Sequence, residues 1–128
     1  MPRVLKTRRF SRWMRKTLLE DSMLCRAVAE MEDGLIDADL GGYVYKKRIA
    51  LPGRGKSGSV RTLVATRNGD RWIFMYGFEK NEKDYITKAE LAALQGVARD
   101  FLGFSEEVLS QVIACGQLEE VSYEQNNG

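Results

Sequence analysis

The sequence predicts an α+β protein, because helical and β-type patterns occupy different thirds of the chain. Apolar residues recur at helical spacing in the first and last thirds, whereas the middle third is rich in β-branched and aromatic residues. A length of 128 residues suggests one domain with a core of its own. We therefore predict an N-terminal helical hairpin packed on an antiparallel β-meander of three to four strands, with helices at the C-terminal end.

The single domain, 1–128, is expected to divide into four consecutive segments. These are a basic N-terminus with the helical hairpin (1–42), a sheet with a basic glycine-rich loop (43–86), C-terminal helices (87–122) and a flexible tail (123–128).

Two amphipathic stretches predict the helical hairpin. In the first, near residues 7–19, the apolar positions are Phe10, Trp13, Met14 and Leu18. In the second they are Leu24, Ala27, Val28 and Met31. Asp21 or Ser22 can cap the second helix, because a short polar side chain accepts hydrogen bonds from the first free amides. Gly34 is expected to end it.

Three strands are expected in the middle of the chain, over residues 44–51, 60–67 and 71–78. Asn68 and Gly69 separate the last two strands, and this dipeptide is a strong hairpin signal because both residues tolerate positive φ. Side chains alternate across a strand, so the last strand is expected to carry its aromatic residues on one face. These residues are Trp72, Phe74, Tyr76 and Phe78.

The C-terminal third is expected to contain two helices. Thr87 and Glu90 form a capping box, in which hydroxyl and carboxylate satisfy free amides at the start of a helix. Ser105 is expected to cap the second helix, and Gly116 to end it. The buried stripe of the first of these helices is Leu91, Leu94, Ala98, Phe101 and Leu102.

Composition excludes several classes of function. The chain contains no histidine, which removes histidine-dependent nucleophiles, acid–base pairs and metal sites. Two cysteines make neither a metal-ligand pattern nor a disulfide framework. No apolar run approaches the roughly 20 residues of a membrane helix. We therefore expect a cytoplasmic protein with no membrane partner, no bound metal and no cofactor.

The formal net charge is only +2, but the charges are segregated along the chain. Residues 1–16 hold seven basic residues and no acid, and residues 46–71 hold eight basic residues and one acid. The other two segments, 17–45 and 72–128, are acidic. Folding can bring the basic segments onto one surface that attracts phosphate backbones. The alternative is a solvated face balanced by neighbouring acids.

The glycine-rich segment 53–58 imitates nucleotide-binding motifs without meeting their requirements. Its GxGxxG pattern precedes an expected strand rather than the helix that a dinucleotide site needs. A Walker A loop requires glycine where Ala50 stands. The segment is therefore expected to be a basic loop whose backbone amides, with Arg54 and Lys56, can hold phosphate.

Further cations flank this loop. Strand alternation puts Lys46 and Arg48 on one face of their strand and Lys47 on the other. Arg61 shares its face with Leu63 and Ala65, which predicts a partly apolar surround for a guanidinium. Additional basic residues, Lys80 and Lys83, follow the third strand.

These residues together resemble the RelE/HigB toxin family, and in particular its branch of HigB-like translational repressors. The resemblance rests on the run from Lys46 to Ala50, the glycine-rich segment, Arg61, and Tyr76-Gly77-Phe78-x-Lys80-Asn81-Glu82. It implies a microbial-ribonuclease-like fold and cleavage of mRNA in the ribosomal A site. It also implies a cognate antitoxin, expected to be a small helix-turn-helix protein, through which alone the toxin would meet operator DNA.

The resemblance also implies which residues carry the chemistry. Arg61, Lys80 and Glu82 are the expected catalytic residues, and Glu79 is a further, weaker candidate for the base. RNA and phosphate are expected to bind at Lys46, Arg48, Arg54, Lys56, Tyr76 and Lys83. Two alternatives stay open: a toxin of the same fold directed at gyrase, and a non-catalytic RNA-binding module.

Overall fold

The structure is a computed structural model that describes residues 2–53, 58–79 and 85–122. Within these residues the chain forms four helices and a sheet of six strands. In chain order the elements are β1 (Arg3–Thr7), α1 (Arg8–Met14), α2 (Asp21–Glu32), β2 (Ala38–Asp39), β3 (Val44–Ile49), β4 (Val60–Ala65), β5 (Arg71–Glu79), α3 (Lys88–Gly103), α4 (Glu106–Ala114) and β6 (Leu118–Val121).

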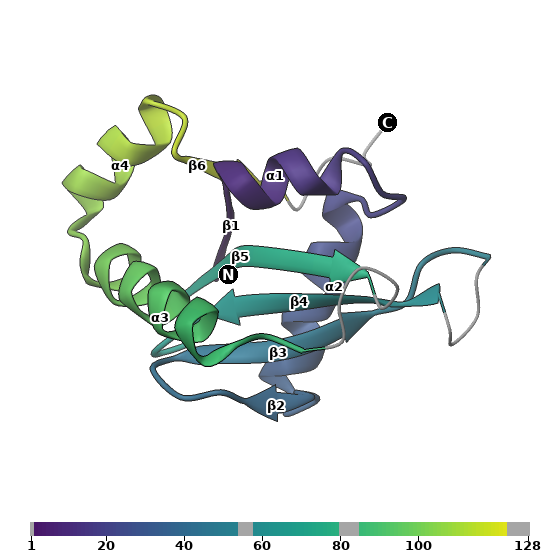
Figure 1. Ribbon diagram of the computed structural model, residues 1–128. Helices are drawn as coiled ribbons and strands as arrows, with labels where there is room; N and C mark the ends of the chain where they lie inside the picture. The colour runs from purple at the N-terminus through teal and green to yellow at the C-terminus, as the bar shows by residue number, and fades with distance from the viewer. Residues whose placement is uncertain (1, 54–57, 80–84, 123–128) are drawn as a thin grey trace.

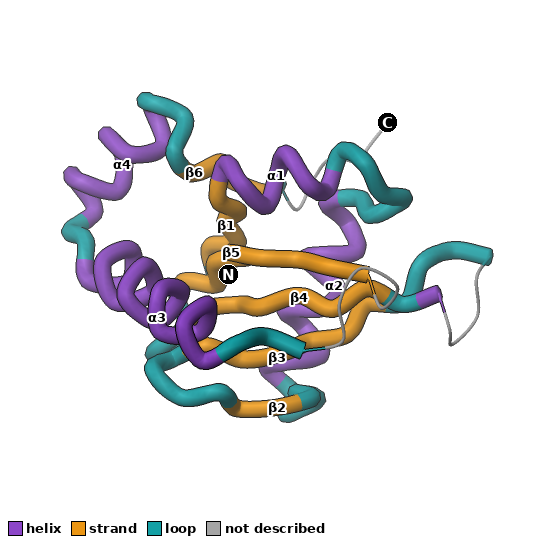
Figure 2. The backbone as a smooth tube through the Cα atoms, viewed as in Figure 1, coloured by secondary structure: helices purple, strands orange, loops and turns teal. Residues whose placement is uncertain are grey.

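The strands lie in the order β2-β3-β4-β5-β1-β6, and every neighbouring pair is antiparallel except β1 and β5, which are parallel. Helix α2 crosses one face of this sheet and α3 lies over the other (Figure 1). The tube view follows the chain from α3 through α4 to β6 at the edge of the sheet (Figure 2). The α+β class and the β3–β4–β5 meander are confirmed, but the expected three to four antiparallel strands are corrected to a mixed sheet of six.

The beginning of the chain, Arg3–Thr7, forms strand β1. The sequence predicted a helix from about residue 7 and no regular structure before it. Val4 and Leu5 are both buried and belong to different hydrophobic clusters, as adjacent residues of a strand with two covered faces do. In the sequence this pair stands among basic residues and is too short to give a strand pattern, so the strand was not predicted. Because β1 pairs with both β5 and β6, it joins the two ends of the chain in one sheet.

The first helix is shorter than the helical periodicity predicts. It ends at Met14, and the Thr17 hydroxyl donates to the Met14 carbonyl and accepts from the Leu19 amide. Such side-chain bonds offer the backbone an alternative to helix. Leu18 is consequently 53% exposed, whereas Leu19 is 5% exposed and joins the core.

The expected helical hairpin is also wrong. Helix α1 lies beside the edge of β5, while α2 covers a face of the sheet (Figure 1). The reason is that β1 pairs only with Arg71–Phe74 of β5, and α1 continues along the second half of that strand. Helix α2 keeps its predicted buried stripe and its glycine stop, with Gly34 at a φ of 91°, although its N-cap is Glu20 and no side chain bonds there.

Two hydrophobic clusters fill the space on either side of the sheet. The cluster on the α2 side includes Phe10, Leu24, Val28 and Phe74. The cluster on the α3 side includes Leu5, Leu63, Leu94 and Leu109. Both faces of the central strands are therefore covered, which explains why β4 and β5 are buried along most of their length.

A β-bulge in β5 overturns the prediction that its aromatic residues share a face. Leu63 pairs with Tyr76 and Val64 pairs with Phe74, so Met75 is the extra residue. Trp72 and Phe74 consequently belong to the α2-side cluster, whereas Tyr76 packs against the α3-side cluster. The Tyr76 and Phe78 rings lie 5.8 Å apart between centroids.

The turn and capping signals have mixed outcomes. The β4–β5 hairpin is confirmed, but only Gly69 of the two turn residues has positive φ, and the loop runs from Thr66 to Asp70. Both N-caps predicted for the helices of the C-terminal third are confirmed: Thr87 and Glu90 form the capping box of α3, and Ser105 caps α4. The segment 87–122 is not wholly helical, because its end forms β6. Within the described residues, no helix combines the length and apolar character needed to cross a membrane.

Candidate nucleic-acid interface

Four of the predicted site residues lie on the α3 side of the sheet, in two adjacent rows across β3, β4 and β5. One row is Arg48, Arg61 and Phe78, and the next is Lys46, Leu63 and Tyr76. Directly paired residues on one face of a sheet have Cβ atoms roughly 4.5–5.5 Å apart. We call the four polar members and Phe78 the basic sheet face: Lys46, Arg48, Arg61, Tyr76 and Phe78.

The strand alternation predicted for the three cations of β3 is confirmed at Lys47. Its side chain lies on the opposite side of the sheet, where Nζ bonds the Glu30 carboxylate at 2.8 Å and the Leu35 carbonyl at 2.9 Å. Lys47 is 6% exposed, so its charge is satisfied inside the fold. By the same alternation, Lys46 and Arg48 belong to the face of the sheet on the α3 side.

Arg48 and Arg61 form a directly opposed pair of like charges. Such a pair destabilises a sheet unless something compensates for the repulsion. Arg61 is half-buried, as its partly apolar strand face predicts, and it forms no ion pair with any residue that the structure describes. An anion bound between the two guanidinium groups would remove the repulsion, and Arg matches phosphate with its two-pronged donor geometry.

Other cations are held by carboxylates and belong to the scaffold. Arg71 is 8% exposed; it donates to the Phe101 carbonyl at 2.9 Å and to Glu106 at 3.1 Å. Arg3 bridges Glu120 and Glu106. Hydrogen bonds to Glu120, aided by the charges of both carboxylates, raise the pKa of Arg3 above its ordinary value despite partial burial. These pairs attach α4 and β6 to the sheet.

Five of the expected site residues lie outside the described part of the chain. They are Arg54, Lys56, Lys80, Glu82 and Lys83. The described residues that border these two segments are brought to one end of the sheet, because Ile49, Val60 and Glu79 stand in register there. This row directly follows the row of Arg48, Arg61 and Phe78.

The structure adds Arg9, which the sequence did not single out, to the surroundings of the basic sheet face. The Arg9 guanidinium lies 4.8 Å from the centre of the Tyr76 ring, within the range of a cation–π contact. Thr7 caps α1 and donates to the Met75 carbonyl at 3.3 Å, which fixes the start of the helix beside β5. Nothing in the periodicity of residues 7–19 places Arg9 near Tyr76, because that contact depends on α1 lying along the sheet edge.

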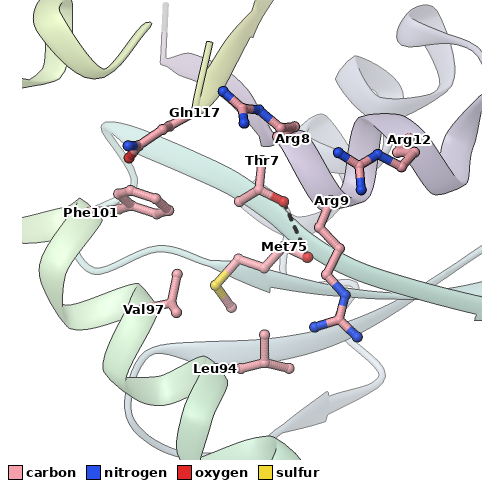
Figure 3. A pocket seen from close by; sticks show the side chains of 9 residues that line it. All are labelled: Thr7, Arg8, Arg9, Arg12, Met75, Leu94, Val97, Phe101 and Gln117. Carbon is pink, nitrogen blue, oxygen red and sulfur yellow. Dashed lines mark hydrogen bonds between the residues drawn. The ribbon is translucent and has the colours of Figure 1, made fainter. Parts of the chain in front are cut away.

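Between α1 and α3 lies a pocket of about 520 Å³ with basic residues on one side and apolar residues on the other. Figure 3 shows the lining residues: Arg8, Arg9 and Arg12 come from α1, Leu94, Val97 and Phe101 from α3, and Met75 from β5. Arg8 donates to the carbonyls of Gly116 and Cys115 and so ties α1 to the end of α4. Arg9 and Arg12 are exposed, and among the described residues they have no carboxylate partner.

Comparison of the sequence with known proteins identifies its family. A search of proteins with curated descriptions found no match to the sequence. A family profile described as "RelE toxin of RelE / RelB toxin-antitoxin system" matches residues 2–121, which include every described helix and strand. The chain therefore belongs to the RelE family of toxins from RelE/RelB toxin–antitoxin systems.

Proposed function

We propose that this toxin is a metal-independent, ribosome-dependent endoribonuclease of the HigB-like branch, which cuts mRNA and thereby stops translation. Membership of the RelE family supports the toxin role and implies a cognate antitoxin that restrains it. We propose a small helix-turn-helix protein as that antitoxin, and contact with operator DNA only through the complex. The substrate, mRNA on the ribosome, would be met in the cytoplasm.

The observation that carries the proposal is the pairing of Arg48 with Arg61 on a face that also presents the half-buried ring of Tyr76. Two arginines that are register partners and form no ion pair with any described residue suit a phosphodiester, although the Asp37 carboxylate accepts from the Arg48 backbone amide at 2.7 Å. The half-buried ring of Tyr76 suits a base of single-stranded RNA, because proteins recognise unpaired bases largely by stacking. The Phe78 ring is 5% exposed and packs beside Tyr76 inside the fold. The combination favours RNA over a small anion, which needs no aromatic neighbour.

The proposed chemistry uses the 2′-hydroxyl of the RNA as nucleophile against its own phosphate. The bond from the 2′-oxygen to phosphorus forms, the bond to the 5′-oxygen breaks, and a 2′,3′-cyclic phosphate is left. Arg61 would stabilise the negative charge of the five-coordinate phosphorane, since a guanidinium stays protonated and binds two oxygens at once. Arg48 and Lys46 would hold the flanking phosphates.

The proton transfers are assigned to residues beyond the end of β5. Lys80 is proposed to donate to the leaving 5′-oxygen or, in its neutral form, to accept the 2′-proton. Glu82 is the alternative base, and Glu79 is a weaker candidate for the same role. Arg54, Lys56 and Lys83 are proposed to contact the RNA backbone. A chain without histidine depends on such groups, and the ribosome would supply the orientation of the substrate.

Arg61→Ala tests the proposal. We expect the variant to lose growth arrest, and primer extension on translated messages to show no new ends. The control is Arg67→Ala, since Arg67 is an exposed cation just beyond the other end of the same strand. Circular dichroism would establish that both variants are folded.

Three results would contradict the proposal. Full cleavage by the folded Arg61→Ala variant would remove Arg61 from the site. Cleavage that disappears equally with Arg67→Ala would show that only overall charge matters. Intact messages accompanied by DNA damage in cells expressing the wild-type protein would identify a gyrase-directed toxin instead.

A further inference from the structure

We propose that Arg9 and Tyr76 form a binding site for one unpaired RNA base, next to the phosphate-binding row of Arg48 and Arg61. The inference rests on the proposed function, because it names a contact with the same substrate. It adds Arg9 and the hollow beside Tyr76 to that substrate contact, and it concerns the binding of a base rather than cleavage at a phosphate.

The first observation is the position of Arg9. Its side chain extends from α1 toward Leu94 of α3 and so crosses the space between the two helices (Figure 3). Its guanidinium lies over the Tyr76 ring at 4.8 Å from the centroid. A planar cation over an aromatic ring leaves its outer face able to stack on a further flat group, and base stacking on Arg is a recurrent mode of RNA recognition.

The second observation is that Arg9 separates two hollows. The larger one, of about 520 Å³, and a smaller one, of about 170 Å³, share three lining residues: Arg9, Leu94 and Val97. The smaller hollow is completed by Tyr76, Ile86, Glu90 and Ala93. Its volume is smaller than the roughly 300–1,000 Å³ of pockets that bind drug-sized ligands, so the hollow suits a single ring system rather than a whole nucleotide.

The chemistry of the smaller hollow selects a base over a phosphate. Aliphatic side chains and an aromatic ring make most of its wall, and the Glu90 carboxylate disfavours a second anion. Glu90 is held in place by the capping box, where its Oε1 accepts from the Thr87 amide at 2.9 Å. A flat, neutral, hydrogen-bonding ring between α3 and Arg9 meets all of these conditions.

The third observation is the spacing to the phosphate row. Tyr76 stands two residues before Phe78 on β5, and Phe78 is the register partner of Arg61. At about 3.3 Å per residue, the two rows lie roughly 7 Å apart along the strand. This is the scale of one nucleotide, so a base on Tyr76 and Arg9 and a phosphate at Arg61 can belong to the same or adjacent residues of one RNA strand.

The experiment measures binding without cleavage. A short fluorescent RNA, carrying 2′-deoxy sugars so that it lacks the nucleophile, is titrated with purified toxin and followed by anisotropy. A second RNA of the same length carries abasic positions. We expect Arg9→Ala and Tyr76→Leu each to weaken binding of the first RNA by roughly 5- to 150-fold, the effect of losing one stacked base. The abasic RNA should bind the wild-type protein more weakly, and the two variants should lose little further on it.

Arg15→Ala is the matched control, because Arg15 is an exposed cation at the end of the same helix and lines neither hollow. It should reduce affinity only slightly and equally for both RNAs. Arg9→Lys should keep the salt dependence of binding but lose discrimination against abasic RNA, since an ammonium has no stacking face.

The proposal is overturned if Arg9→Ala and Arg15→Ala weaken binding equally, if abasic and intact RNA bind alike, or if the wild-type protein has no measurable affinity for the RNA. These outcomes are separable from failure of the nuclease proposal. A protein that discriminates abasic RNA but cleaves no message would retain the base site and lose the enzymatic role, whereas the reverse result would remove the base site alone.

Discussion

The indole of Trp13 lies directly against the backbone of Gly77. A Cβ atom at Gly77 would stand 2.3 Å from Cζ3 of the Trp13 ring, far inside contact distance. Trp13 also packs against Phe10, at 5.4 Å between ring centroids, and Phe10 against Phe74 of β5. Gly77 is therefore the point at which α1 approaches β5, and the approach brings Arg9 within reach of Tyr76.

Gly77→Ala is expected to destabilise the protein by about 1–3 kcal/mol, because the indole must move out of a packed site. Urea unfolding would measure the change. Gly103→Ala is the control, since a Cβ at this exposed last residue of α3 meets no atom within 4 Å. That substitution should be neutral or slightly stabilising through helix propensity. Equal losses for the two variants would contradict the packing argument.

Lys46→Met and Lys47→Met are expected to have opposite consequences although the residues are neighbours. Lys47 is buried and bonded to Glu30 and Leu35, so its replacement should lower the free energy of unfolding by about 1–3 kcal/mol. Lys46 lies on the basic sheet face, so its replacement should weaken RNA binding and reduce the salt slope by about 1. Urea unfolding would measure the stability of both variants, and titration with RNA would measure their affinity. An RNA defect confined to Lys47→Met would reverse the assignment of the two faces.

Glu106→Gln is expected to loosen the attachment of α4. Glu106 accepts from Arg3 at 2.7 Å and from the buried Arg71 at 3.1 Å. Its side chain is 70% exposed, so we expect a loss of about 1–2 kcal/mol, between the values for exposed ion pairs and for buried charged hydrogen bonds. Glu107→Gln alters the neighbouring exposed carboxylate, for which no ion pair occurs among the described residues, and should change stability little. Hydrogen exchange should locate the loosening in α4.

The two cysteines are expected to differ in reactivity. Burial raises the pKa of the Cys25 thiol above its ordinary value, and the nearby charge of Asp21 adds to the rise. Because the thiolate is the reactive form, a raised pKa lowers the reactive fraction near neutral pH. Iodoacetamide at pH 7.5 should therefore label the exposed Cys115 before Cys25, and labelling of Cys25 should increase as the pH is raised toward 10. Mass spectrometry would follow both sites; faster labelling of Cys25 would contradict the expectation.

Local signals determined much of the fold. The buried stripe of α2, the caps at Thr87 and Ser105, and the stop at Gly34 depend on residues within a few positions of each other, and all are present in the structure. The predicted stripe of α3 is present in part: Leu94, Ala98 and Leu102 are buried, whereas Leu91 and Phe101 are half-buried. The alternation that separates Lys47 from Lys46 and Arg48 is local for the same reason. These features follow from backbone hydrogen bonding and from the periods of helix and strand.

The predictions were wrong where the local structure depends on a segment that is distant in the sequence. Strand β1 exists because β5 and β6, more than 60 and 110 positions away in the chain, supply its hydrogen-bond partners, as the pairs Arg3 with Arg71 and Val4 with Val121 illustrate. The bulge at Met75 shifts the face on which Tyr76 lies, and no periodicity reveals a single extra residue. In the same way, α1 lies at the sheet edge rather than in a hairpin only because β1 occupies part of β5.

By itself, the sequence determined the fold class, the position of most helices and the family, because these depend on local patterns and on a motif spread along the whole chain. Only the tertiary structure decided which cations share a surface. Arg48 and Arg61 come together across a strand pair, Lys47 turns to the opposite side, and Arg9 arrives from another element altogether. Charge along a chain has no direction until backbone pairing and side-chain packing orient each residue, and that orientation is a property of the whole fold.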